Sequence, residues 1–173
     1  MSMSVGEQQD LTAARRRHGR VVVGVDGSPG SRAALNAAVR AADLRGDVLQ
    51  VVTASIPEDE FGAWGNGAWA AVPPPDPERL RAAARDMAER MVKDVLGELT
   101  GHLRSNPSIE VVVKSGHPAR VLLDTARDAD QLYVGHRGRG AVSSFLLGSV
   151  GLHCVTGARC PVTVVPQADA AES

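Results

Sequence analysis

The stretch that decides the fold class is RVVVGVDGSP, residues 20–29. A run of valines without polar alternation is typical of a strand that is buried on both faces, as in parallel sheets. The run ends in turn residues, and Ser28-Pro29 is typical of a helix N-cap with proline at the first helical position. A buried strand that leads directly into a helix is the building unit of α/β proteins, and this is the class that the stretch predicts.

The same unit recurs along the chain. Short apolar segments predict strands at residues 48–54, 109–114, 131–135 and 162–165, and helices are predicted to begin at Asp76-Pro77, Pro118 and Ser149. We therefore expect an α/β fold: one domain with an open, parallel, five-stranded sheet, Rossmann-like, with helices on both faces and strand order 3-2-1-4-5. The expected domain covers residues 19–166, between a disordered N-terminal tail at 1–18 and a C-terminal tail at 167–173.

The composition argues against several classes of function. The 173 residues include 19 Lys+Arg and 20 Asp+Glu, and only 3% are aromatic, which is unlike a nucleic-acid-binding surface. No apolar run approaches the ~20 residues that span a bilayer, and the N-terminus has no secretory signal pattern. Cys154 and Cys160 lack CxxC spacing, so we expect buried or partly buried thiols in a reducing cytoplasm. The sequence predicts a cytoplasmic protein that binds neither nucleic acid nor membrane.

The polar residues gather at one predicted point of the sheet. In this strand order, ligands bind at the carboxyl ends of the first and fourth strands, where the order reverses. The first strand leads into Asp26-Gly27-Ser28, and the fourth leads into GHRGRG at residues 135–140. Gly148-Ser149 then precedes a short helix, whose N-terminus offers backbone N–H groups and the positive end of the helix dipole. A glycine loop and a helix N-terminus together predict a site for a polyphosphate.

Competing nucleotide motifs do not match. The chain has no GxxxxGK[ST] segment, and the turn after the first strand does not fit GxGxxG. Fast phosphoryl transfer has no P-loop lysine or placed general base, and no His, Cys, Asp and Glu residues have metal-ligand spacing. We therefore predict no catalytic residue and no metal site built by the protein alone.

These segments together resemble the universal stress proteins of the ATP-binding type. The spacing G-x2-G-x9-G-S, from Gly135 to Ser149, is similar to the nucleotide-binding signature of that family. VVGVDGS at residues 22–28, GHPA at 116–119 and CPVTVVP at 160–166 are similar to its opening strand, third helix start and closing strand. The resemblance covers about residues 19 to 166, and the full glycine signature is its most specific part.

The resemblance implies ATP at the switch point, with Mg²⁺ carried on the phosphates. It also implies that Asp26 contacts the nucleoside, Ala54 lies against the adenine and Gly135 lies by the ribose. The complete set of residues expected to bind the nucleotide is Asp26, Ser28, Ala54, Gly135, His136, Arg137, Gly138, Arg139, Gly140, Gly148, Ser149 and Val150. Family members commonly dimerise through the last strand, which predicts a homodimer through Val162–Val165.

The function expected from the resemblance is regulatory. ATP occupancy would change surfaces that an unidentified protein partner reads in a stress response, with slow or no hydrolysis. One alternative is a slow ATPase or phosphotransferase in which His136 or Asp26 assists. Another is a nucleotide-free interaction module that uses Trp64 and Trp69, which lie in a Gly/Pro-rich connection.

Some candidate residues also have structural alternatives. Asp26 could serve the turn before the first helix, and Gly138 and Gly140 could be ordinary loop glycines. The side chains of Arg137 and Arg139 could be solvated.

Overall fold

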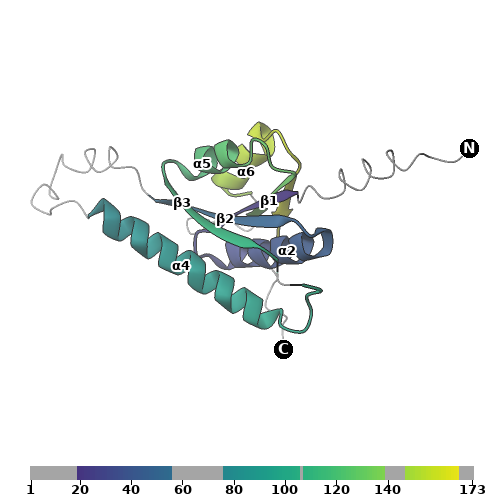
Figure 1. Ribbon diagram of the computed structural model, residues 1–173. Coiled ribbons are helices and arrows are strands. Elements are labelled where there is room, and N and C mark those ends of the chain that lie inside the picture. Colours follow the sequence, from purple (N-terminus) through teal and green to yellow (C-terminus); the bar gives the residue numbers. More distant parts are fainter. Residues whose placement is uncertain (1–18, 56–75, 106, 139–146, 168–173) are drawn as a thin grey trace, which may run out of the picture.

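The computed structural model describes residues 19–55, 76–105, 107–138 and 147–167, and strands and helices alternate along the chain (Figure 1). In chain order, the elements are β1 (Arg20–Gly24), α2 (Pro29–Arg45), β2 (Val48–Ser55), α4 (Pro77–Glu98), β3 (Ile109–Ser115), α5 (Pro118–Thr125), β4 (Gln131–Gly135), α6 (Ser149–Gly157) and β5 (Val162–Val165). The bounds agree with the predicted strands to within a residue or two.

The five strands form one parallel sheet in the order β3-β2-β1-β4-β5, which confirms the predicted topology. α2 and α4 cover one face of the sheet, and α5 and α6 cover the other (Figure 1). β1 pairs with β2 on one side and with β4 on the other, so the strand order reverses between β1 and β4. This is the switch point at which the sequence predicts the site.

The valine run of β1 contributes to both layers of the core. Val21 and Val23 pack with Leu35 and Val39 under α2, whereas Val22 packs with Leu132 under α5 and α6. Because successive side chains of a strand point to opposite faces, a strand in the middle of a covered sheet needs apolar residues at every position. This explains why the run has no polar alternation.

The ends of α2 follow the sequence signals. Ser28 is the N-cap and accepts a hydrogen bond from Ser31 N at 3.2 Å, and Pro29 is the first helical residue. At the other end, Gly46 has a φ of 71°, a left-handed conformation that favours glycine. Ser28 thus fixes where α2 begins, in the turn that follows β1, and Gly46 fixes where α2 ends.

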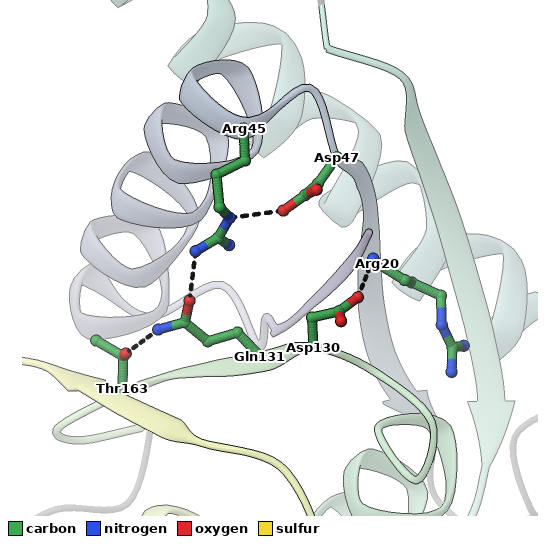
Figure 2. Close-up of polar contacts among 6 residues, drawn as sticks. All are labelled: Arg20, Arg45, Asp47, Asp130, Gln131 and Thr163. Atoms are coloured by element: carbon green, nitrogen blue, oxygen red, sulfur yellow. Dashed lines mark hydrogen bonds and ion pairs between the residues drawn. The ribbon is translucent and has the colours of Figure 1, made fainter. Parts of the chain in front are cut away.

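Polar contacts join the amino ends of the strands (Figure 2). Arg45 Nε donates to Asp47 Oδ2 at 2.6 Å, and Arg45 Nη1 donates to Gln131 Oε1 at 2.8 Å. Gln131 Nε2 in turn donates to Thr163 Oγ1 at 2.7 Å, which ties β5 to β4. The start of β5 is therefore anchored at the sheet end that lies opposite the switch point.

Candidate functional site

The turn after β1 holds the Asp26 carboxylate in place. Val25 N still donates to Val52 O at 2.9 Å, and the chain then turns at Gly27, whose φ of 86° favours glycine. Asp26 Oδ1 accepts hydrogen bonds from Ser28 N at 3.0 Å and from Ser28 Oγ at 2.6 Å. The carboxylate is thus fixed over the turn at the switch point.

Ser28 has a structural role at this turn. Its side chain is buried, and its hydroxyl accepts from Ser31 N while it donates to the Asp26 carboxylate. These contacts satisfy one of the first N–H groups of α2. The role of Ser28 in ligand binding stays a prediction.

The end of β4 lies directly against the start of α2. A Cβ atom built on Gly135 would lie 2.5 Å from the carbonyl carbon of Gly30, and one built on Gly30 would meet the Arg137 carbonyl oxygen. A residue with a side chain therefore cannot stand at either position without a backbone shift. Close packing gives Gly135 a role that does not depend on a ligand, and its predicted place by a ribose stays a prediction.

Asp26 and Gly138, which are far apart in the sequence, lie in contact. A Cβ atom built on Gly138 would lie 2.6 Å from Asp26 Oδ2. The Arg137 carbonyl oxygen also lies 3.4 Å from Ser28 Oγ. The structure thus brings together the two segments that the sequence analysis selects, one after β1 and one after β4.

The N-terminus of α6 closes the same group of residues. Gly148, its N-cap, donates from its backbone N to His136 O at 2.9 Å. A Cβ atom built on Gly148 would lie 3.5 Å from His136 O and 3.6 Å from Arg137 Cα. Among the described residues, no side chain caps this helix end, and the positive end of the helix dipole lies at the first turn, at Ser149 and Val150.

The remaining predicted residues lie near this point or outside the described residues. Ala54 is the penultimate residue of β2 and is half-buried on the α5 face of the sheet. Arg139 and Gly140 lie outside the described residues, as do Trp64 and Trp69. The predictions made for these four residues stay predictions.

Sequence reasoning missed two residues of the site. Gly30 lets α2 approach the end of β4, and Ser31 Oγ accepts from Asp26 N at 3.3 Å and donates to Ser28 O at 2.9 Å. The spacing Ser28-x-x-Ser31 at a helix start carries a signal for the second residue. Gly30 carries none, because its contact partner lies more than a hundred residues away.

Burial disfavours the thiolate form of both cysteines. Cys154 is fully buried in the core, and burial raises the pKa of its thiol to about 11, with a smaller contribution from the neighbouring Cys160. Burial also raises the pKa of Cys160, and both cysteines are free. Thiols that stay protonated at neutral pH do not support nucleophilic catalysis.

The described part of the chain also limits other kinds of site. It holds no group of three or more His, Cys, Asp and Glu side chains that could bind a metal ion. None of its helices is long and apolar enough to cross a membrane.

The fold and this site define a class: an α/β protein with a Rossmann-like sheet, in which a carboxylate, a glycine turn and a helix N-terminus meet at the switch point. The family model described as "Universal stress protein family" matches residues 18–166. The chain belongs to this family.

Relatives and solved structures agree with this assignment. Universal stress protein Rv1996 of Mycobacterium tuberculosis is 34% identical over 161 residues, which cover 89% of this chain and 46% of the relative. The chain spans about half the length of the curated relatives it matches. The structure of UspA from Lactobacillus plantarum has a TM-score of 0.66 at 22% identity and covers 86% of this chain and 98% of that one.

Some structural relatives were solved with nucleotides. A universal stress protein in complex with cAMP has a TM-score of 0.54 at 25% identity and covers 87% of this chain and 98% of that one. The universal stress protein of Archaeoglobus fulgidus in complex with dAMP has a TM-score of 0.56 at 18% identity, covering 86% of this chain and 98% of that one.

Proposed function

We propose that the chain binds an adenine nucleotide, ATP, at the switch point between β1 and β4. The observation that carries the proposal is the contact of Gly148 N with His136 O, which brings the start of α6 against the Arg137–Gly138 backbone. A helix N-terminus beside a glycine turn is a favourable place for phosphate groups. The nucleotide complexes of structural relatives support the choice of an adenine nucleotide.

The residues fit such a ligand in two ways. The turn at Gly138 and the cap at Gly148 carry no side chains, so phosphates can approach the backbone closely. A Cβ atom built on Gly138 would meet Asp26 Oδ2, and we propose that the Asp26 carboxylate contacts the nucleoside. Ala54 would lie against the base, and Mg²⁺ would ride on the phosphates, which are its usual ligands.

The site favours regulation over catalysis. The Asp26 Oδ1 atom accepts two hydrogen bonds from Ser28, so this oxygen is engaged in the turn before α2. The backbone N–H and C=O groups of His136 are hydrogen-bonded to Val165 O and Gly148 N, and none of the described carboxylates pairs with its ring. We therefore propose slow or no hydrolysis and place the protein in the cytoplasm as a nucleotide-dependent regulator of a stress response.

The regulated surface that we propose is a homodimer interface at β5. β5 is an edge strand without a charged residue, and its four residues are half-buried. On α6, which follows β4 and leads into β5, Leu152 is 52% exposed and Val155 is 49% exposed. An open apolar strand edge beside exposed apolar side chains is a surface that pairs with another chain.

A single residue, His136, connects this interface with the nucleotide site through its backbone. His136 N donates to Val165 O at 2.8 Å at the end of β5, and His136 O accepts from Gly148 N at the start of α6. A nucleotide that orders the Gly148 turn would also order the end of β5. By linkage, the factor by which ATP changes dimer affinity must equal the factor by which dimerisation changes ATP affinity.

The test uses the glycine at the start of α6. A Cβ atom at Gly148 makes only ordinary contacts of 3.5 Å or more, so Gly148→Ala should fold normally and yet narrow the approach to the backbone. We expect calorimetry to show ATP affinity reduced by about tenfold in Gly148→Ala and lost in Gly148→Glu. Gly97→Ala, at an α4 position with open space, is the matched control and should bind like the wild type.

Mass spectrometry of nucleotide released by denaturing the purified protein identifies the ligand. ATP in the wild type would indicate slow or no hydrolysis, whereas ADP would favour the ATPase alternative. A folded wild type that neither carries nor takes up any adenine nucleotide in the presence of Mg²⁺ contradicts the proposal. Such a result would favour the nucleotide-free interaction module instead.

A further inference from the structure

The two open edges of the sheet differ in charge. β3 and β5 are the edge strands, and each edge exposes backbone groups that can pair with a strand of another molecule. β5, with the sequence VTVV, has no charged residue, whereas β3, with the sequence IEVVVKS, carries Glu110 and Lys114. Charged side chains on an edge strand are a common protection against pairing.

The hydrogen-bond pattern shows which groups of β3 face outward. Leu49 N donates to Ser108 O at 2.9 Å, and Gly116 N donates to Ser55 O at 3.1 Å, so the even-numbered residues of this segment bond to β2. Because the direction of backbone groups alternates along a strand, the N–H and C=O groups of Val111 and Val113 point away from β2. These are the groups that an incoming strand would need.

Two arginines of α4 contact β3, and one of them, Arg85, reaches an outward backbone group. α4 packs along β3, and Arg85 Nη1 donates to Val111 O at 3.3 Å. One helical turn earlier, Arg81 Nε donates to Ser115 Oγ at 3.1 Å, and that hydroxyl also lies 3.1 Å from Ser55 Oγ. Glu89 Oε1, 3.8 Å from Arg85 Nη1, helps to hold the guanidinium in this position.

We infer that Arg81 and Arg85 close the β3 edge against pairing with a second copy of this chain. A strand that pairs with β3 needs Val111 O as an acceptor, and it must displace the Arg85 guanidinium from that oxygen. It must also lie beside the charged side chains of Arg81, Arg85, Glu110 and Lys114, and taking these groups out of water is costly. Strand pairing between copies of this chain is therefore left to the β5 edge, and pairing through one edge alone gives closed rather than open-ended assemblies.

The experiment removes the two guanidinium groups from the full chain and measures the mass of the species that the chain forms in solution. In sedimentation velocity over a range of protein concentrations, Arg81→Ala/Arg85→Ala should show a weight-average mass at least twice that of the wild type. Arg79→Ala/Arg90→Ala removes the same charge from exposed positions of the same helix and should sediment like the wild type. Adding Val113→Pro to Arg81→Ala/Arg85→Ala removes one outward N–H and should restore the wild-type mass.

The inference does not depend on the oligomeric state of the wild type. A rise in weight-average mass that Val113→Pro reverses supports the inference. This holds whether the rise is from monomer to dimer or from dimer to larger species. An unchanged mass in Arg81→Ala/Arg85→Ala overturns the inference. An equal rise in the control pair also overturns it, because loss of charge alone would then explain the association.

Discussion

The contact between Asp26 and Gly138 joins the two segments of the site at the scale of single residues. A methyl group at position 138 would lie 2.6 Å from Asp26 Oδ2, while Ser28 holds Oδ1 of the same carboxylate. Gly138→Ala should therefore lower the free energy of unfolding by on the order of 1 kcal/mol, because the carboxylate must move away from Ser28. Urea denaturation without nucleotide measures this effect.

A double-mutant cycle isolates the cause. In an Asp26→Ala background the obstructing carboxylate is absent, so the added methyl group should cost much less. The two substitutions should thus be non-additive, with a coupling energy of at least about 0.5 kcal/mol. Additive effects would show that the methyl group at position 138 acts through something other than Asp26.

At the scale of elements, Asp43 of α2 fixes the segment that follows α4. Its carboxylate accepts hydrogen bonds from Arg104 N and Ser105 N, each at 2.8 Å, and from Ser105 Oγ at 3.0 Å. The hydrogen bond from Arg104 N, partly offset by burial and reinforced by Ser105, lowers the pKa of Asp43 below its ordinary value of 3.8. Folding is therefore linked to the ionised form of this side chain.

The direction of the pH dependence follows from this lowered pKa. The stabilisation is fully present above the unfolded pKa, near 4, and is lost as the pH falls through the lower pKa of the folded state. Asp43→Asn should be clearly less stable than the wild type at pH 7, and the difference should shrink as the pH approaches 3. Urea denaturation at both pH values measures it, and an equal difference at both would contradict the role of ionisation.

The sequence predicts the elements better than it predicts their contacts. Valine runs, helix caps and glycine stops place the strands and helices of the described residues, because these signals act over a few neighbouring residues. The meeting of Asp26 with Gly138, and of Gly30 with Gly135, depends on how α2 crosses the end of β4. The Arg85 contact with Val111 O likewise depends on how α4 lies along β3, and helical periodicity alone marks Arg85 only as an exposed residue.

At the scale of the whole molecule, the two faces of the sheet offer a test of the proposed dimer. Leu152 and Val155 lie on α6, whereas Leu44, which is 59% exposed, lies on α2 at the opposite face (Figure 1). If the dimer forms at β5 and α6, both α6 side chains become buried in it. Burial of such a side chain contributes about 1.5–3 kcal/mol, so their loss should be large.

Leu152→Glu/Val155→Glu should therefore raise the dimer dissociation constant by at least about a hundredfold, because two charges would replace apolar contacts. Leu44→Glu makes the same change as Leu152→Glu at a leucine of similar exposure on α2 and should leave the dimer unchanged. Sedimentation equilibrium measures the dissociation constants, with and without ATP. Since the backbone of His136 joins the end of β5 to the start of α6, ATP should shift the dissociation constant of the wild-type dimer. The monomeric Leu152→Glu/Val155→Glu variant should still bind ATP, because neither substitution lies in the proposed nucleotide site. A wild type that stays monomeric at all concentrations and with ATP contradicts the β5 dimer, while ATP binding by that monomer would leave the proposed nucleotide site intact.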